Sequence, residues 1–218
     1  MALSDIHGRV DSFSLAGSEL SAADVVVLAG DLTTFGKADA CARVVEGVRR
    51  FNPRVLAITG NCDHPECETY LTQAGMALHR RHVVIDGIAF VGLSGSLPCP
   101  VRTLQEANER QLGQWLDDAV QGLDTGVPKI LVSHEPPQDT AVDFARTGEH
   151  AGSAAVRRFI ERHQPLICFT GHIHEGRGMD RIGNTTVVNP GAWAQGGFAV
   201  AEVNGRNVKV ELRSIYRT

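Results

Sequence analysis

Two histidines one residue apart, His172 and His174, follow an apolar run at residues 166–169 of this 218-residue chain. Taken alone, the pair is as typical of a solvated loop as of a binding site, because histidine serves many roles. Four other apolar runs also end in side chains that can bind a metal ion: Asp5 and His7, Asp31, Asn61, and His134. Together the five motifs supply two carboxylates, one amide and four imidazoles.

The chain before residue 62 is expected to fold as strand, helix, strand, helix, strand. The expected helices span residues 11–20 and 37–51, and the second and third strands span residues 25–28 and 54–59. The first expected strand looks truncated, because its apolar run is shorter than the usual strand length of about five residues. Parallel sheets of this kind place ligands beyond the carboxyl ends of their strands. Asp5, Asp31 and Asn61 can therefore meet.

The rest of the chain predicts further alternation of strands and helices. We expect helices at residues 65–74, 104–122 and 153–163, a hairpin at 76–95 turning at Asp86-Gly87, strands at 129–133 and 166–170, and antiparallel strands between 179 and 213. The long polar loop at 135–152 is the candidate for substrate selection. This order predicts an α/β fold of two packed mixed sheets with helices outside, as one domain over residues 1–218.

The ligand types restrict the metal chemistry. Histidine, carboxylate and amide ligands without thiolates favour Mn, Fe, Zn or Co over an all-sulfur structural site. Seven ligands exceed the needs of one tetrahedral ion but suit two ions that share a carboxylate. Such a pair, about 3.5–4 Å apart, can bind a phosphate oxygen and hold a hydroxide for in-line attack. Neither a GxSxG nucleophile elbow nor a GxxxxGK[ST] P-loop is present.

The motifs, in this order, resemble the signature of the calcineurin-like metallophosphoesterases, namely DxH, GD, GN, a lone His and GHxH. The resemblance extends from Asp5 to the NPG run at 189–191. It implies a four-layer α/β/β/α sandwich with two divalent ions, manganese being favoured, and a bridging hydroxide as nucleophile. It also implies the ligands: Asp31 shared, Asp5, His7 and His174 on one ion, and Asn61, His134 and His172 on the other. Asp31, Asn61 and His134 are the implied catalytic residues.

The sequence departs from this family at Cys62. Many members have a histidine there, which is thought to contact phosphate and protonate the leaving group. A thiol with an ordinary pKa of about 8.5 is a poor proton donor in that role. His64, two residues further on, is a weaker candidate for the same role. Some members also read GNCD, so the substitution is compatible with an intact metal site.

Three functions are compatible with these residues. The leading one is hydrolysis of a small phosphodiester or phosphomonoester. The second is an interaction scaffold with little or no activity, since one retromer subunit resembles this family in fold yet works through interactions. The intact ligand set argues against it. The third is hydrolysis of a non-phosphate ester or amide, because a metal-bound hydroxide also attacks carbonyls.

Composition limits the partners. The net charge of −4 and the pI near 6.1 provide no basic field for an extended nucleic acid. No apolar run approaches the ~20 residues needed to span a membrane, and no signal peptide is visible. Five cysteines without CxxC spacing favour reduced thiols. We therefore expect a cytoplasmic protein, and a homo-oligomer is compatible with the sequence.

Several other polar residues have two interpretations. Asp63 and Glu135 adjoin candidate ligands, so each is either a partner that orients an imidazole or an ordinary solvated carboxylate. His150 either contacts substrate from its loop or is solvated. Three remaining expectations concern structure alone: His79 and His82 at the surface, His163 as a charge at a helix end, and Trp115 in the core.

Overall fold

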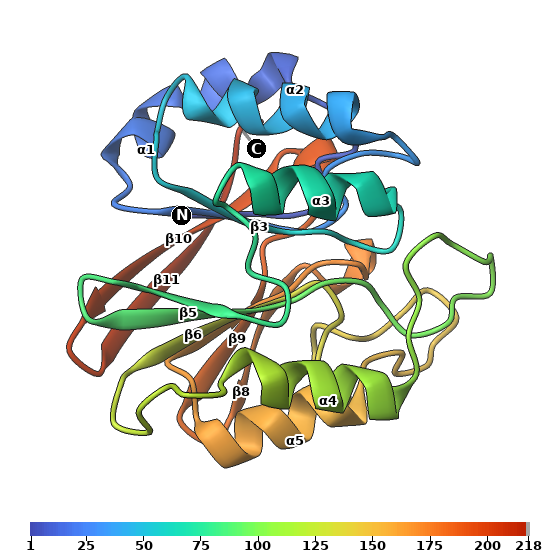
Figure 1. Ribbon diagram of the computed structural model, residues 1–218, viewed down its shortest axis with the longest axis vertical. Coiled ribbons are helices and arrows are strands. Elements are labelled where there is room, and N and C mark those ends of the chain that lie inside the picture. The colour runs from blue at the N-terminus through green and yellow to red at the C-terminus, as the bar shows by residue number, and fades with distance from the viewer. Residues whose placement is uncertain (217–218) are drawn as a thin grey trace.

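The computed structural model describes residues 1–216, which form two β-sheets packed face to face, with helices on both outer faces (Figure 1). Strands of the first sheet are β1 (Ala2–Leu3), β2 (Val26–Ala29), β3 (Val55–Ile58), β10 (Gly197–Asn204) and β11 (Asn207–Ser214). Strands of the second are β4 (His82–Ile85), β5 (Ile88–Leu93), β6 (Lys129–Ser133), β7 (Ile167–Phe169), β8 (Gly178–Ile182) and β9 (Thr185–Asn189).

The α-helices are α1 (Gly17–Ala22), α2 (Ala38–Arg49), α3 (Pro65–Gln73), α4 (Glu109–Ala119) and α5 (Ala154–His163). Short 3₁₀ helices lie at Asp11–Ala16, His174–Gly176 and Trp193–Gln195. The strand order is β11-β10-β1-β2-β3 in the first sheet and β4-β5-β6-β7-β9-β8 in the second. Both sheets contain parallel and antiparallel pairs. The predicted four-layer α/β/β/α sandwich of two mixed sheets is confirmed.

Three apolar layers hold the sandwich together. The layer between the first three helices and the first sheet contains Leu20, Val44, Val48 and Leu71. The layer between the two sheets contains Ile58, Val132 and Ile167. The layer beneath α4 and α5 contains Leu116, Leu131 and Phe159. Strands β2, β3 and β6 are buried along their whole length. Continuous apolar runs of this kind are typical of strands that are covered on both faces.

Capping side chains set the helix starts. Asn108 and Gln111 form a capping box, so α4 begins at Glu109 and not near residue 104 as predicted. Residues 104 and 105 instead donate their backbone N–H groups to the Asn61 carbonyl, at 3.0 and 3.1 Å. Because the helix begins after this cap, residues 104 and 105 lie outside it and contact the loop that carries Asn61.

The tail strands pair antiparallel with one another, as predicted, and β9 also pairs in parallel with β7.

The predictions for three histidines were wrong. His79 is half-buried and packs edge-on against the half-buried Trp115, and burial lowers the pKa of His79 to about 4. His163 is no helix-end charge, since burial lowers its pKa and the ring stacks on Phe159. His82 is half-buried, with Nδ1 2.8 Å from the Ala119 carbonyl.

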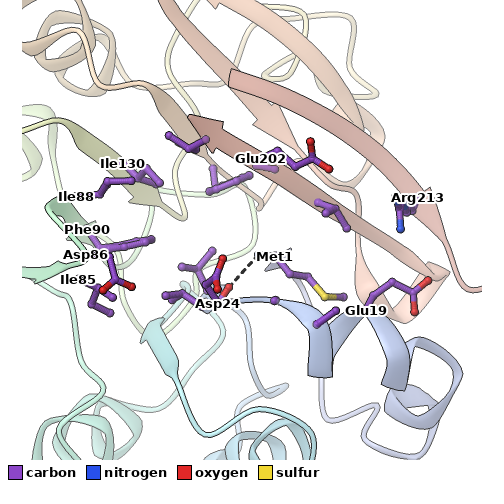
Figure 2. Close-up of a pocket in the computed structure, with 18 of the residues that line it drawn as sticks. Met1, Glu19, Asp24, Ile85, Asp86, Ile88, Phe90, Ile130, Glu202 and Arg213 are labelled. Carbon is purple, nitrogen blue, oxygen red and sulfur yellow. Dashed lines mark hydrogen bonds between the residues drawn. The ribbon is translucent and has the colours of Figure 1, made fainter. Parts of the chain in front are cut away.

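A cavity of about 810 Å³ opens between the sheets beside the amino ends of β1 and β2 (Figure 2). Met1 and Asp24 line one side, and Phe90 and Ile130 of the second sheet line another. β1 pairs with β10 only through Ala2 and Ala199. Within residues 1–216, no strand pairs with the same edge of β10 from residue 200 onward. No helix in this part of the chain is long and apolar enough to cross a membrane.

The unpaired edge of β10 is expected to accept an extended segment in line with β1. Four β-branched residues added ahead of Met1 should pair with residues 201–204 and fill part of the cavity, with each buried apolar side chain stabilising by about 1.5–3 kcal/mol. Thermal unfolding followed by circular dichroism should show a higher Tm than for a Gly-Ser extension of equal length. Equal Tm values for the two extensions would contradict the expectation.

Candidate metal centre

Five segments bring the seven predicted ligands to one edge of the two sheets. Each segment follows the carboxyl end of a strand: β1 precedes Asp5 and His7, β2 precedes Asp31, β3 precedes Asn61, β6 precedes His134, and β7 precedes His172 and His174. The carboxyl ends of parallel strands meet at one edge, so residues distant in the sequence become neighbours. Metal binding by these seven residues remains a prediction.

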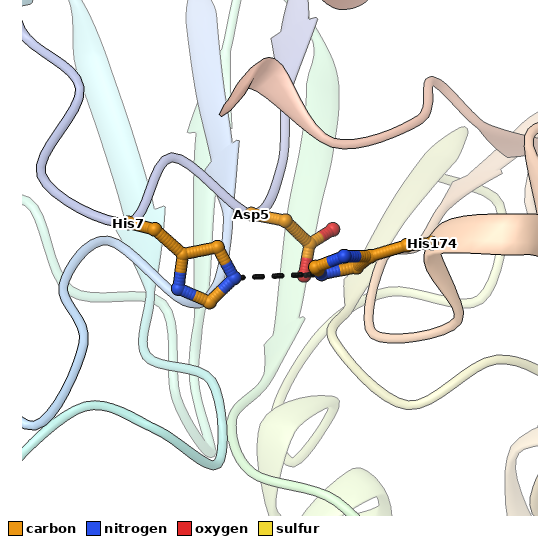
Figure 3. A group of neighbouring side chains, drawn as sticks. All are labelled: Asp5, His7 and His174. Carbon is orange, nitrogen blue, oxygen red and sulfur yellow. Dashed lines mark hydrogen bonds and ion pairs between the residues drawn. The ribbon is translucent and has the colours of Figure 1, made fainter. Parts of the chain in front are cut away.

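Asp5, His7 and His174 form the first group (Figure 3). His174 Nε2 lies 3.3 Å from Asp5 Oδ1 and 3.4 Å from His7 Nε2. The two imidazole rings meet edge-on, with centroids 5.4 Å apart. One potential ligand atom from each of the three residues lies within 4.8 Å of the others. This spacing suits three ligands around one ion.

The second group is built around Asp31 and His134, with Asn61 and His172 beside them. One potential ligand atom from each of Asp5, Asp31 and His134 lies within 4.8 Å of the others, so Asp5 adjoins both groups. His134 Nε2 lies 3.0 Å from Asn61 Oδ1 and 3.4 Å from Asp31 Oδ1. The rings of His134 and His172 also meet edge-on, with centroids 5.2 Å apart. The other Asp31 oxygen, Oδ2, lies 3.8 Å from His7 Nε2 in the first group. The two oxygens of Asp31 therefore face imidazoles of different groups, an arrangement that would let this carboxylate bridge two ions through both oxygens.

Hydrogen bonds to surrounding backbone and side-chain groups orient the imidazoles. His134 Nδ1 lies 2.9 Å from the Ala29 carbonyl, which fixes a donor at Nδ1 and leaves the Nε2 lone pair free. His7 Nδ1 lies 3.1 Å from the Thr34 hydroxyl. Asn189, from the NPG run, donates to the Ile173 carbonyl at 2.8 Å and so holds the loop between the two terminal histidines.

Asp63 and Glu135 are fully buried, which excludes the solvated interpretation of both. Asp63 accepts backbone N–H groups of residues 32, 33 and 60, at 2.7–3.0 Å, and so ties the Asp31 loop to the Asn61 loop. Burial and the Asp31 charge raise the pKa of Asp63 to about 6. Burial raises the pKa of Glu135 to about 8, and its Oε2 accepts the Leu97 N–H at 2.9 Å. The structure records no hydrogen bond from either carboxylate to an imidazole within residues 1–216.

The signature glycines make room for side chains from other motifs. A Cβ atom on Gly30 would collide with the His134 ring, and one on Gly60 would collide with Asp31. A Cβ atom on Gly171 would collide with Ser4 and would lie 2.7 Å from Asp5 Oδ2. Each glycine therefore permits the close approach of a loop that carries candidate ligands.

Four of the seven candidate ligands have left-handed backbone conformations. The φ angles are 52° at Asp5, 49° at His7, 48° at Asp31 and 67° at His172. Such angles are uncommon for residues with a side chain and cost of order 1–3 kcal/mol where they are strained. Their concentration in these loops indicates that the loop shape serves the site.

The charges of the site fit a divalent cation. Asp5 and Asp31 are 0% and 3% exposed, and within residues 1–216 their ion-pair partners are histidines alone. Burial alone would raise the pKa of Asp5, but its hydrogen bond to His174 and the nearby imidazoles hold that pKa below its usual range. Burial lowers the pKa of His172 to about 4, so the ring is neutral at pH 7. Buried carboxylates beside neutral imidazoles are typical of metal sites.

The side chains that the sequence offered as a proton donor or as a substrate contact have other partners. His64 caps α3, with Nδ1 accepting the Glu66 N–H at 3.2 Å. His150 Nδ1 lies 2.7 Å from Asp143 Oδ1, and this hydrogen bond raises the pKa of His150. The Cys62 backbone N–H donates to Asp31 Oδ1 at 2.9 Å, and burial beside Asp31 raises the pKa of its thiol.

Two residues beside the centre were missed by the sequence analysis. Thr103 Oγ1 accepts the Asn61 side-chain amide at 3.1 Å, and Cys99 Sγ lies 3.7 Å from His172 Nε2. Both belong to an irregular segment after β5 that has no periodic pattern. A cysteine between two prolines was the only sequence signal at this place.

The sequence profile of the calcineurin-like phosphoesterase superfamily domain matches residues 1–205. An uncharacterised protein of Methanocaldococcus jannaschii is 35% identical over 196 residues, covering 87% of this chain and 86% of that protein. A UPF0046 protein of Caenorhabditis elegans is 28% identical over 209 residues, covering 87% and 68%. The chain belongs to the calcineurin-like phosphoesterase superfamily.

Solved structures show the same fold. TT1561 of Thermus thermophilus superposes with a TM-score of 0.75 at 19% identity, covering 99% of this chain and 97% of that one. The purple acid phosphatase of yellow lupin superposes with a TM-score of 0.55 at 12% identity, covering 79% and 37%. The predicted family resemblance is confirmed.

Asp31→Ala is expected to reduce metal content at both positions, because Asp31 faces both ligand groups. Metal analysis of the purified variant by mass spectrometry measures the loss. Asp24→Ala is the matched control, since Asp24 is exposed and lines the cavity away from these ligands. Two tightly bound ions in Asp31→Ala would contradict the shared role of this carboxylate.

Gly60→Ala is expected to destabilise the fold and weaken metal binding, because the added methyl group would displace Asp31. Overpacking of this kind typically costs about 1–3 kcal/mol. Urea unfolding and metal analysis measure the two effects. In the control Gly113→Ala, in α4, the new methyl group would meet only Ala155 of α5, at an ordinary contact distance of 3.7 Å, so both properties should be retained. A fully stable, fully loaded Gly60→Ala protein would refute the steric argument.

Proposed function

We propose that this chain is a dinuclear metal-dependent phosphoesterase that hydrolyses a small phosphodiester or phosphomonoester. The observation that carries the proposal is the orientation of Asp31, whose two oxygens face two separate ligand groups. Asp5, His7 and His174 would hold one divalent ion, and Asn61, His134 and His172 would hold the other. Asp31 would belong to both.

Two ions held there would polarise a phosphoryl oxygen and lower the pKa of bound water to give a nucleophile. The protein's part is to fix the ligands in place. The carbonyl of Ala29 orients His134, and Asp63 holds the loops of Asp31 and Asn61 together. A preorganised site of this kind needs little rearrangement during the reaction.

Proton delivery to the leaving group is the weak part of this site. The thiol of Cys62 is a poor donor, and the contacts of His64 and His150 direct their Nδ1 atoms elsewhere. We therefore propose that turnover depends on leaving-group acidity, with activated aryl esters cleaved much faster than alkyl esters. The net charge of −4 and the lack of a basic field favour a small substrate over an extended nucleic acid.

The scaffold alternative is less favoured, because an interaction protein does not need buried carboxylates faced by imidazoles or left-handed ligand residues. Metal analysis combined with hydrolysis of an activated aryl phosphodiester and monoester separates the two. Stoichiometric metal without turnover of any phosphate ester would favour the scaffold.

We also propose that the protein resides in the reducing cytoplasm, because its five cysteines are free thiols.

Cys62→His is expected to raise turnover of an alkyl phosphoester, because imidazole donates a proton well near pH 7. General acid catalysis contributes about 10²–10⁴-fold, so a partly misaligned ring should still give a measurable gain. Cys62→Ser is the control, since it removes the thiol without adding an acid. Metal content is measured in parallel because the larger ring could displace Asn61. Unchanged turnover with full metal content would show that residue 62 is not at the acid position.

A further inference from the structure

We propose that Thr103 and Glu106 are positioning residues that hold the side-chain amide of Asn61 with its oxygen, and not its nitrogen, toward the metal position around Asp31 and His134. The inference rests on the proposed dinuclear centre. It deepens that proposal by naming two residues outside the five signature motifs that orient one of the ligands. Neither residue would touch an ion or the substrate.

The amide of Asn61 has two ends of nearly the same shape and opposite function. Its oxygen can bind a metal ion, whereas its NH₂ group only donates hydrogen bonds. Half a turn about the last side-chain bond exchanges the two ends, so the hydrogen-bond partners decide which end faces the site. Here Oδ1 lies 3.0 Å from His134 Nε2, and Nδ2 donates to Thr103 Oγ1 at 3.1 Å.

His134 by itself would favour the opposite orientation. Its Nδ1 lies 2.9 Å from the carbonyl of Ala29, which can only accept, so Nδ1 is the donor and Nε2 of the neutral ring is an acceptor. Asn61 Oδ1 is an acceptor too, and the two acceptors face each other at 3.0 Å. A rotated amide would donate to Nε2 and occupy the lone pair that a cation needs. The observed orientation therefore has to be held from the other end of the amide.

Glu106 makes Thr103 an acceptor toward that other end. Glu106 Oε1 accepts the Thr103 hydroxyl at 2.6 Å and the Thr103 backbone N–H at 2.7 Å. The Thr103 hydrogen bonds hold the pKa of Glu106 below its usual range, so its carboxylate is ionised at pH 7 and only accepts. Because the single hydroxyl proton of Thr103 points to Glu106, its oxygen can only accept from Asn61. The sulfur atoms of Cys62 and Cys99, 3.7 and 3.9 Å from the same amide nitrogen, are weaker acceptors.

Other contacts keep this segment in place without the hydroxyl. The backbone carbonyl of Asn61 accepts the N–H groups of Leu104 and Gln105, at 3.0 and 3.1 Å. The side-chain amide of Gln105 donates to the carbonyl of Asp63 at 2.8 Å. A Thr103→Val variant keeps these contacts and the shape of the side chain, so it tests the orientation of the amide and not the folding of the segment.

Titration of metal-free protein with Mn²⁺, followed by calorimetry, tests the proposal. Thr103→Val is expected to weaken one of the two binding steps roughly 10–100-fold and to leave the other unchanged. Thr103→Ser, which retains the hydroxyl, should bind both ions like the wild type. Thr185→Val is the matched control, because the buried Thr185 hydroxyl has no hydrogen-bond partner among residues 1–216 and begins β9, at the opposite end from Asn189. Circular dichroism confirms that each variant is folded.

Asn61→Asp distinguishes orientation from general support of the loop. The two oxygens of an aspartate are equivalent, so no orientation has to be selected. In this background Thr103→Val should no longer weaken the affected binding step. Glu106→Ala should weaken that step when Asn61 is present, and clearly less when Thr103→Val is already in place, because contributions that act through one another are not additive.

Three results would overturn the proposal. Two Mn²⁺ ions bound with wild-type affinities in folded Thr103→Val would refute the positioning role and leave the dinuclear centre intact. Equal losses from Thr103→Val in the Asn61 and Asn61→Asp backgrounds would show that Thr103 merely supports the loop. Fewer than two ions bound by the folded wild type would refute the dinuclear centre itself, and the positioning role with it.

Discussion

Buried negative charge without a buried lysine or arginine beside it is the constraint on which this structure depends. Asp5, Asp31 and Asp63 are at most 3% exposed, and within residues 1–216 no lysine or arginine forms an ion pair with them. Isolated buried carboxylates are very unfavourable. Backbone N–H groups satisfy Asp63, whereas the ion-pair partners of Asp5 and Asp31 among residues 1–216 are imidazoles. Bound cations would be the simplest compensation, and the side chains that could hold one lie at this same edge.

The loops take their shape from the same constraint. Carboxylates and imidazoles from five segments approach closely only where Gly30, Gly60 and Gly171 leave space. The chain must also turn sharply after each strand, which places Asp5, His7, Asp31 and His172 in left-handed conformations. Such strain persists only when surrounding structure enforces it. Here the parallel strands on either side are buried and rigid, so they can hold the loops in place.

The sequence predicted those parts of the molecule that depend on local pattern. Apolar runs located most strands, and the order of motifs after them identified the edge where Asp31 and His134 meet. Pairing partners were harder to predict, because an apolar run does not show whether β9 pairs parallel or antiparallel with its neighbours. The roles of Asp63 and Thr103 depend on contacts between distant segments. An isolated polar residue gives no sign of which distant backbone group it will meet.

The two ends of the Asn61 amide have different surroundings. Its oxygen faces His134, whereas its nitrogen faces Thr103, Cys99 and Cys62. Sulfur atoms thus occupy the side of Asn61 where many relatives place an imidazole after this asparagine. Thiols are polarisable and donate protons poorly when their pKa is high. On the proposed function, such a site would stabilise the leaving oxygen mainly through charge, which would favour esters whose leaving groups depart without a proton.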